Sequence, residues 1–255
     1  STIGSLIDNA GTAEVVREVT LTNAFFVGVF PVTQAQYVRI IAKNDDTANS
    51  GGDHAPVNHV NYEDVRGSVA EGVNWPHTGH GKVGPNSFLH ALRARTGLEF
   101  DLPTEAQWEF AARAGNGDTK WGDGSGILNA DKDENLDLLG RYERDGGKVQ
   151  NGTSYANPAQ SCGATNGTAI VGSYAPNAWG LYDMHGNVWE WCYDRYDMYK
   201  REAQINPLGA SVGIYRVNRG GCFYSGAIYC RNTNRNYNPQ DTRNDYIGFR
   251  LALSL

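Results

Sequence analysis

"NAWGLYDMHGNVWEWCYD", residues 177–194, contains the feature on which the fold depends, a run of aromatic and β-branched side chains at its end. This run, "VWEWCYD", is typical of a β-strand because such side chains suit a pleated, half-buried surface. Two further runs of this kind follow, "YRVNRGG" at residues 215–221 and "IGFRLAL" at residues 247–253. We therefore predict strands in the last third of the chain.

Three segments upstream carry the start signals of helices. Thr33 and Gln36 form a capping-box pair near the start of "PVTQAQYVRIIA". Thr104 and Gln107 form the same pair in "PTEAQWEFAARAG", and a third helix is predicted in "PNSFLHALRART", which Gly97 would end. At helical spacing, the side chains predicted to face the core are Tyr37, Ile40, Ile41, Phe88, Leu89, Leu92, Trp108 and Ala111 or Ala112.

The rest of the chain predicts short strands and long loops. Residues 13–30 indicate two short strands, and residues 98–103 indicate one more. Residues 44–54 and 116–179 are mostly polar or glycine, so we predict loops there; a loop region of that second length is usually functional or tightly packed. No internal repeat and no linker-like break in composition is present. We therefore predict one α+β domain over residues 1–255.

Composition excludes two classes of protein. The chain has 255 residues and a net charge of −6, so it has no basic excess and no nucleic acid is expected as a partner. No apolar run approaches the roughly 18 residues of a membrane span. No secretory signal opens the sequence, which leaves a removed signal or lipid anchor open. The 31 glycines and 14 tyrosines favour an irregular α+β fold with long packed loops.

Six stretches occur in order along the chain: "FFVGVFPVTQAQY", "LPTEAQWEFAARAG", "NAWGLYDMHGNVWEWCYD", "RVNRGG", "CRNTNRN" and "IGFRL". Over about residues 19–253 they closely resemble the formylglycine-generating enzyme (sulfatase-modifying factor) family. The resemblance implies a C-type lectin-like fold of the formylglycine-generating enzyme type. This is an α+β fold with small twisted antiparallel sheets, few helices and much ordered loop. Periodicity alone does not indicate that topology.

The enzymes of this family oxidise a sulfatase cysteine to formylglycine with two active-site cysteines that bind copper(I), a metal that thiolates suit. When Gly220 and Gly221 are set on the family pattern, the catalytic positions fall in "FYSGAIY", which has no cysteine. Cys222 and Cys230 lie on either side of this stretch, eight residues apart. We therefore assign no catalytic residue, and a copper-dependent oxidase that acts on a sulfatase cysteine remains the alternative function.

Other thiol and metal signals carry less information. Cys162 and Cys192 are isolated and no CxxC motif occurs, so a zinc ribbon is not expected, and free thiols or at least one disulfide both remain open. His77 and His80 have a spacing at which they can share a metal, but no carboxylate lies beside them. We predict no site there.

A second branch of the family resembles the end of the chain more closely: the variable proteins of diversity-generating retroelements. Their diversified positions take residues encoded by NNC codons, a set that lacks Lys, Glu, Gln, Met and Trp. Residues 222–246 contain none of these except Gln240, and they are rich in Asn. Cys222 and Phe223 depart from the family pattern, which usually has Trp at the second of these positions. The resemblance implies a variable ligand-binding region over residues 220–250.

The residue types in this region suit recognition. Tyr gives a large, rigid surface at low entropy cost, and Asn and Ser give adaptable hydrogen bonds, as in antibody paratopes. Strand-like alternation over residues 229–235 places Asn232 and Asn234 on one common face. A solvated loop that binds nothing is the alternative. The predicted contact residues are Cys222, Phe223, Tyr224, Ser225, Gly226, Tyr229, Asn232, Asn234, Asn236, Tyr237, Asn238, Asp241, Asn244, Asp245 and Tyr246.

The family resemblance also implies a structural calcium site in "GLYDMHGNVWEW". Two side chains and two main-chain carbonyls would form an all-oxygen set, which suits calcium. The implied ligands are Asp183, Glu190, Gly186 and Val188. The alternative for the two acids is a structural hydrogen-bonding role. A second calcium site of the family is incomplete, since Asn157 matches but no matching Asp follows, and no cofactor for catalysis is expected.

Together these observations predict a non-enzymatic, surface-displayed ligand-binding protein of the receptor or adhesin type, hypervariable at its C-terminal region through retroelement-driven mutagenesis. A scaffold member of the family with neither role is a third hypothesis beside the oxidase. The expected partner is an unknown protein or other surface ligand, and the expected state is a monomer. The expected location is the cell surface or extracellular space, as a lipoprotein without its anchor, or a phage particle.

Overall fold

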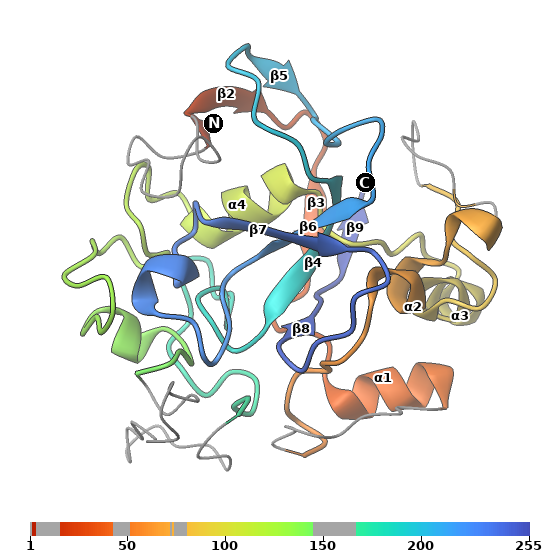
Figure 1. Ribbon diagram of the computed structural model, residues 1–255, viewed down its shortest axis with the longest axis horizontal. Helices are drawn as coiled ribbons and strands as arrows, with labels where there is room; N and C mark the ends of the chain where they lie inside the picture. The colour runs from red at the N-terminus through yellow and green to blue at the C-terminus, as the bar shows by residue number, and fades with distance from the viewer. Residues whose placement is uncertain (1, 4–15, 43–51, 72, 74–80, 145–166) are drawn as a thin grey trace.

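A computed structural model describes residues 2–3, 16–42, 52–71, 73, 81–144 and 167–255, in which short strands and helices are joined by long packed loops (Figure 1). The strands are β1 (Thr2–Ile3), β2 (Arg17–Thr20), β3 (Phe25–Val27), β4 (Trp189–Arg195), β5 (Gln204–Ile205), β6 (Tyr215–Arg219), β7 (Arg235–Pro239), β8 (Ile247–Gly248) and β9 (Ala252–Ser254). The α-helices are α1 (Gln34–Ile41), α2 (Tyr62–Arg66), α3 (Phe88–Thr96) and α4 (Glu105–Arg113). The 3-10 helices are η1 (Val69–Glu71), η2 (Leu136–Leu138) and η3 (Ala227–Cys230).

A four-stranded sheet in the order β7-β6-β4-β8 lies at the centre of the molecule (Figure 1). β6 pairs antiparallel with both β4 and β7, whereas β4 and β8 run parallel. A second sheet has the order β1-β2-β5 with a parallel β2–β5 pair, and β3 pairs antiparallel with β9. The prediction of small sheets is confirmed. Most strand pairs are antiparallel, as predicted; the two parallel pairs, β2–β5 and β4–β8, join strands that a long stretch of chain separates, and such crossovers permit parallel pairing.

The three predicted helices are confirmed: α1 and α4 show the start signals read from the sequence, and α3 ends at Gly97. The Thr33 and Thr104 hydroxyls each accept the main-chain N–H three residues further on. Gln36 and Gln107 complete the two capping boxes by accepting from the cap residue. Helix α2 is missed by periodicity because it has only five residues; it begins at an Asn61 capping box. Among the described residues no helix has the length and apolar character needed to cross a membrane.

The end of the chain differs from the sequence prediction. The run "IGFRLAL" forms two strands rather than one, and these belong to different sheets: β8 pairs with β4 and β9 pairs with β3. The strand expected at residues 98–103 is reduced to a single bridge between Asp101 and Ala252, and Pro103, which has no N–H, cannot extend the pairing. Periodicity does not reveal such a change of partner within a short apolar run.

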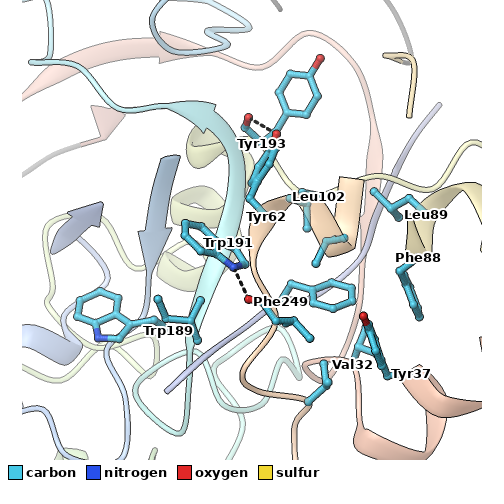
Figure 2. Packing of buried hydrophobic residues seen from close by; sticks show 14 of the residues in the cluster. Val32, Tyr37, Tyr62, Phe88, Leu89, Leu102, Trp189, Trp191, Tyr193 and Phe249 are labelled. Atoms are coloured by element: carbon cyan, nitrogen blue, oxygen red, sulfur yellow. Dashed lines mark hydrogen bonds between the residues drawn. The ribbon is translucent and has the colours of Figure 1, made fainter. Parts of the chain in front are cut away.

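One face of β4 packs into an aromatic core. Trp189, Trp191 and Tyr193 alternate along the strand and belong to one buried cluster (Figure 2). The Trp191 indole donates to the carbonyl of Val60 at 3.0 Å, and the Tyr62 hydroxyl donates to the carbonyl of Tyr193 at 3.0 Å. These two bonds attach the start of α2 to the central sheet.

The other face of β4 packs against α4 through a buried charge pair. The Glu190 carboxylate accepts from Nε and Nη2 of Arg250 at 2.6 and 2.7 Å, and from the Trp108 indole at 2.6 Å. Arg250 also donates to the carbonyls of Gly28 and Tyr182. A bidentate arginine–carboxylate pair fixes geometry as well as adding energy. The guanidinium therefore ties the sheet, α4 and the segment after β3 together.

The described part of the long loop region is packed through buried contacts among its own residues and with η3. Nε2 of His185 accepts the N–H of Gly122 at 2.9 Å, and Nδ1 lies 2.9 Å from the carbonyl oxygen of Cys230. Burial lowers the pKa of His185 to about 4, so the imidazole is neutral at pH 7. A Cβ at Gly140 would lie 1.6 Å from the His185 carbonyl oxygen, and so only glycine permits this approach. The prediction of a tightly packed loop region is confirmed for these residues.

Glu190→Gln should lower the free energy of unfolding by about 3 kcal/mol, because it leaves the Arg250 guanidinium buried without its counter-charge. Glu99→Gln is the matched control: Glu99 also pairs with an arginine, Arg93, but is 51% exposed, so its loss should change stability by less than about 1 kcal/mol. Urea unfolding at neutral pH measures both variants. Equal losses would contradict the structural role of the buried pair.

Candidate binding face

Two glycines open the C-terminal segment, residues 220–250, at a point where a side chain would clash. Gly220 and Gly221 follow β6 with φ of 100° and 78°, in the region that favours glycine. A Cβ on Gly221 would lie 2.5 Å from Sγ of Cys230, and one on Gly220 would lie 3.1 Å from the Trp108 ring. This turn sends the following residues into the molecule rather than along its surface.

Three of the predicted contact residues lie inside that turn. The N–H of Cys222 donates to Oγ of Ser225 at 3.1 Å, and the N–H of Ser225 returns a bond to the Cys222 carbonyl. Phe223 donates its N–H to the carbonyl of Asn187 at 2.9 Å. All three residues are buried, at 7% exposed or less. Their predicted place on an exposed face is therefore wrong, because the two glycines fold this turn into the core.

Asn232 and Asn234 are also buried, and their side chains bond to main chain. Nδ2 of Asn232 donates to the carbonyl of Thr119 at 2.8 Å, and Nδ2 of Asn234 donates to that of Tyr229 at 2.9 Å. The alternation predicted over residues 229–235 is wrong, because η3 and a turn occupy residues 227–233. These amides act as structural partners for backbone groups.

The other ten predicted residues are exposed or half-exposed, and we call them the C-terminal face. Tyr229 and Tyr237 are the most exposed tyrosines of the segment, at 54% and 44%. The face consists of Tyr224, Gly226, Tyr229, Asn236, Tyr237, Asn238, Asp241, Asn244, Asp245 and Tyr246. One segment thus contains both a buried set of residues and an exposed set.

Strand β7 is the edge of the central sheet and presents side chains on two sides. Arg235 points toward α4, where it pairs with Glu105. Asn236 and Asn238 alternate to the opposite side, where Nδ2 of Asn218 donates to Oδ1 of Asn238 at 2.9 Å. The strand therefore contributes asparagines to one side and, at residue 237, a tyrosine to the other.

The Tyr237 ring belongs to an aromatic cluster at this edge. Its centroid lies 4.2 Å from that of Tyr196 and 5.1 Å from that of Tyr215. Aromatic pairs at such distances contribute about 0.5–1.5 kcal/mol beyond their buried area. Tyr237 is thus held in place while 44% of its surface stays open to a partner.

The last part of the face rests on the loop before α2. The main-chain N–H of His59 donates to the carbonyl of Asn244 at 3.0 Å, and Nδ1 of His59 lies 2.8 Å from Oδ1 of Asp245. The Tyr246 hydroxyl accepts from Nδ2 of Asn244 at 2.6 Å, and its ring packs against Tyr224 at 4.8 Å. Tyr224, which precedes β7 in the sequence, and Tyr246, which follows it, thereby meet in this part of the face.

Beneath β7, two glutamates of α4 hold two arginines of the sheet. The Arg235 guanidinium donates to both oxygens of Glu105, at 2.6 and 2.8 Å. Arg219, fully buried at the end of β6, pairs with Glu109. Its guanidinium also donates to main-chain carbonyls in the turn before β7. We call Glu105, Glu109, Arg219 and Arg235 the α4 charge network; it fixes the backbone beneath the exposed side chains.

The described cysteines are buried free thiols, and Cys162, like His77 and His80, lies outside the described residues. Burial raises the pKa of the Cys222 thiol to about 12 and that of Cys230 well above its usual range. Sγ of Cys222 lies 3.2 Å from Oγ of Ser225. Copper(I) ligation and nucleophilic attack both need a thiolate. The environment of these two cysteines therefore disfavours such chemistry.

The residues expected to bind calcium do not fit that ion as they are arranged. Both oxygens of Glu190 are bonded to Arg250, whose guanidinium supplies the positive charge. Asp183 accepts from the N–H of Gly172 at 2.8 Å and from Nδ2 of Asn187 at 3.1 Å, and burial raises its pKa to about 6. The geometry matches the alternative, a structural hydrogen-bonding role, and we base no function on calcium. Asn157 lies outside the described residues.

With this fold and this surface in view, comparison with known proteins identifies the class. The chain matches the sulfatase-modifying factor enzyme 1-like domain over residues 4–255 and belongs to that family. A formylglycine-generating enzyme of Thermomonospora curvata is 37% identical over 161 residues, which are 59% of this chain and 48% of the relative. The serine/threonine-protein kinase pkn1 of Chlamydia pneumoniae is 30% identical over 252 residues, 94% of this chain and 34% of the relative. The chain spans about a third to a half of the length of these relatives.

Two solved structures share the fold over the whole chain. Treponema denticola variable protein 1 superposes with a TM-score of 0.74 at 23% identity, covering 100% of this chain and 92% of that one. PvdO from Pseudomonas aeruginosa superposes with a TM-score of 0.68 at 24% identity, covering 100% and 91%. The predicted C-type lectin-like fold of the formylglycine-generating enzyme type is thereby confirmed.

Asn232→Ala should lower the free energy of unfolding by about 1–3 kcal/mol, because it leaves the Thr119 carbonyl without its side-chain partner in a buried site. Asn236→Ala, four residues on and half-exposed, should change it by less than about 0.5 kcal/mol. Chemical denaturation followed by tryptophan fluorescence measures both. If the two substitutions had the same effect, the division of the segment into buried and exposed asparagines would be incorrect.

Proposed function

We propose that this protein is a non-enzymatic ligand-binding protein whose C-terminal face is the receptor surface, diversified by retroelement-driven mutagenesis. The observation that carries the proposal is the division within residues 220–250. Ten residues of the types Tyr, Asn, Asp and Gly are open to a partner, while the neighbours that hold the backbone are buried. Rigid scaffolding beneath adaptable side chains lowers the entropy that binding must overcome.

The scaffold residues explain how such a face can vary. The α4 charge network bonds to main-chain carbonyls, and Asn232 bonds to the Thr119 carbonyl, so neither depends on the exposed side chains. Changes at Tyr229 or Asn236 therefore leave the backbone contacts intact. The fold that the chain shares with Treponema denticola variable protein 1 also supports a face that can vary.

The second candidate is a copper-dependent oxidase of the formylglycine-generating type. Relatives that bear that enzyme's name favour it, and Cys222 and Cys230 lie within the same buried turn region. Against it, the pKa values of both thiols are raised by burial, and neither thiol is exposed. A scaffold role without ligand binding is the third candidate. It does not explain why large tyrosine side chains are exposed on this face.

Display and partners belong to the same proposal. A diversified face is of use only where foreign ligands reach it, so we place the protein at a cell surface, in the extracellular space or on a phage particle. The ligand is a protein or another surface molecule, and its identity is a property of this variant. A single copy of the chain provides the whole face, and so we propose a monomer.

The genome that encodes the chain gives the first test. A near-copy of the coding segment for residues 222–246 should lie beside a reverse transcriptase gene. The near-copy should carry AAC where the gene differs, and the differences should fall at codons of the C-terminal face such as those for Tyr229 and Tyr237. Codons for Arg231 and Arg235, both tied to the scaffold, should agree between the two copies. Absence of the near-copy would refute diversification.

An activity assay separates the proposal from the oxidase. Aerobic incubation with copper(I) and a peptide carrying a sulfatase motif should give no aldehyde, because both thiols are buried and closed to a peptide substrate. Mass spectrometry of the peptide detects the product. Aldehyde that forms with the native chain and disappears in Cys222→Ser or Cys230→Ser would overturn the non-enzymatic function.

A further inference from the structure

The C-terminal face is too small to form a whole protein–protein interface. It has ten residues, whereas a stable interface takes about 20–30 residues from each partner. A protein that binds the face must therefore also touch scaffold residues outside residues 220–250. The scaffold residues nearest to β7 are those of β6, its neighbour in the central sheet, and the residues that lead into β6 (Figure 1).

Three of these neighbours are large apolar side chains that are open to solvent. Val212, Ile214 and Tyr215 are 77%, 63% and 42% exposed. Single exposed apolar residues are common, but several together indicate an interaction surface. We call these three residues the apolar rim. They carry no charge, and they precede the segment proposed to vary, so every variant would carry the same rim.

The rim borders the C-terminal face on both sides of the sheet. The Tyr215 ring centroid lies 5.1 Å from that of Tyr237 on one side. Ile214 comes just before β6, and its carbonyl accepts the N–H of Gln240 at 3.2 Å. Because successive side chains alternate along a strand, Ile214 lies on the other side, with Asn238. Neighbours across an antiparallel pair are about 4.5–8 Å apart, so a partner that covers Tyr237 or Asn238 reaches the rim as well.

Main-chain groups anchor the rim at both ends. The Ser211 carbonyl accepts from Nη1 of Arg195 at 2.8 Å, and the Tyr215 carbonyl accepts the N–H of Tyr196 at 3.0 Å. Together with the bond between Ile214 and β7, these contacts hold residues 211–215 against the sheet without using the rim side chains. Apolar side chains on a backbone that is already ordered lose less entropy when a partner covers them.

The chemistry of the rim favours a protein over a glycan as its occupant. Val212 and Ile214 offer no hydrogen bond to a hydroxyl group, so a sugar packed on them would lose its bonds to water. Apolar side chains of a protein instead gain free energy in proportion to the area that they bury. We propose that the apolar rim is the constant part of the receptor surface, and that the ligand is a protein whose apolar side chains pack on it. This inference rests on the proposed function.

Selection of binders from a library of the full chain, displayed on cells, tests the rim. Lysozyme serves as the protein probe and dextran as the glycan probe. The rim stays native in the library, and the codons randomised to NNC are those of Tyr229, Asn236, Tyr237, Asn238 and Asp241. Lysozyme should select binders, and dextran should select none that need the rim.

In each lysozyme-binding clone, the double change Val212→Ser and Ile214→Ser should weaken binding about tenfold or more, because it removes apolar contacts from the interface. Tyr215 is kept, since its ring supports Tyr237. Ile205→Ser is the matched control. Ile205 is 70% exposed but lies in β5, in a separate sheet away from β7 (Figure 1), so its change should leave the affinity as it was.

The outcomes separate the rim from the C-terminal face. Lysozyme binders that lose no affinity in the double variant, or lose as much in Ile205→Ser, would overturn the rim and leave the face as the receptor surface. Dextran binders that depend on the rim would overturn the assignment to a protein ligand. A library without a binder to either probe would overturn the receptor role of the face itself. Thermal unfolding without ligand shows whether each variant is folded, and Val212→Ser alone should still weaken binding severalfold if the double variant is unstable.

Discussion

The α4 charge network is the constraint on which the C-terminal segment depends. Arg219 is fully buried, pairs with Glu109 and donates to main-chain carbonyls ahead of β7, while Arg235 forms a bidentate pair with Glu105. A buried charge without its partner is strongly destabilising, so each member holds the others in place. The network acts on backbone and on the first residue of β7. The exposed side chains beyond it take no part in this anchoring.

The C-terminal segment must fold stably and must also present side chains to a partner, and different residues meet these two requirements. The residues that fold it are buried: the turn after Gly221 directs Cys222 and Phe223 inward, and Asn232 and Asn234 bond to backbone carbonyls. The residues open to a partner follow or alternate with these. A face built in this way can change its chemistry with little effect on stability, which is what a diversified receptor requires.

Local signals in the sequence predict much of the fold, but not its long-range pairing. The capping boxes at Thr33 and Thr104 locate two helices because they are contacts within one turn. The split of "IGFRLAL" into β8 and β9 depends on which distant strands are available, and no local pattern encodes that. For the site, residue type predicted exposed positions such as Tyr229 and Tyr237, but it assigned Asn232 and Asn236 the same role. Their burial differs because η3 and the turn after it replace the expected strand.

The central claim is that the backbone of the C-terminal segment is fixed independently of its exposed side chains. Amide hydrogen exchange on a variant with Tyr229, Asn236 and Asp241 all changed to serine measures this directly. We expect the amides of β6 and β7, and those of residues 232–234, to keep the protection that they have in the native chain. Loss of protection confined to this segment, in a variant that stays folded elsewhere, would show that the exposed side chains hold the backbone and would contradict the account.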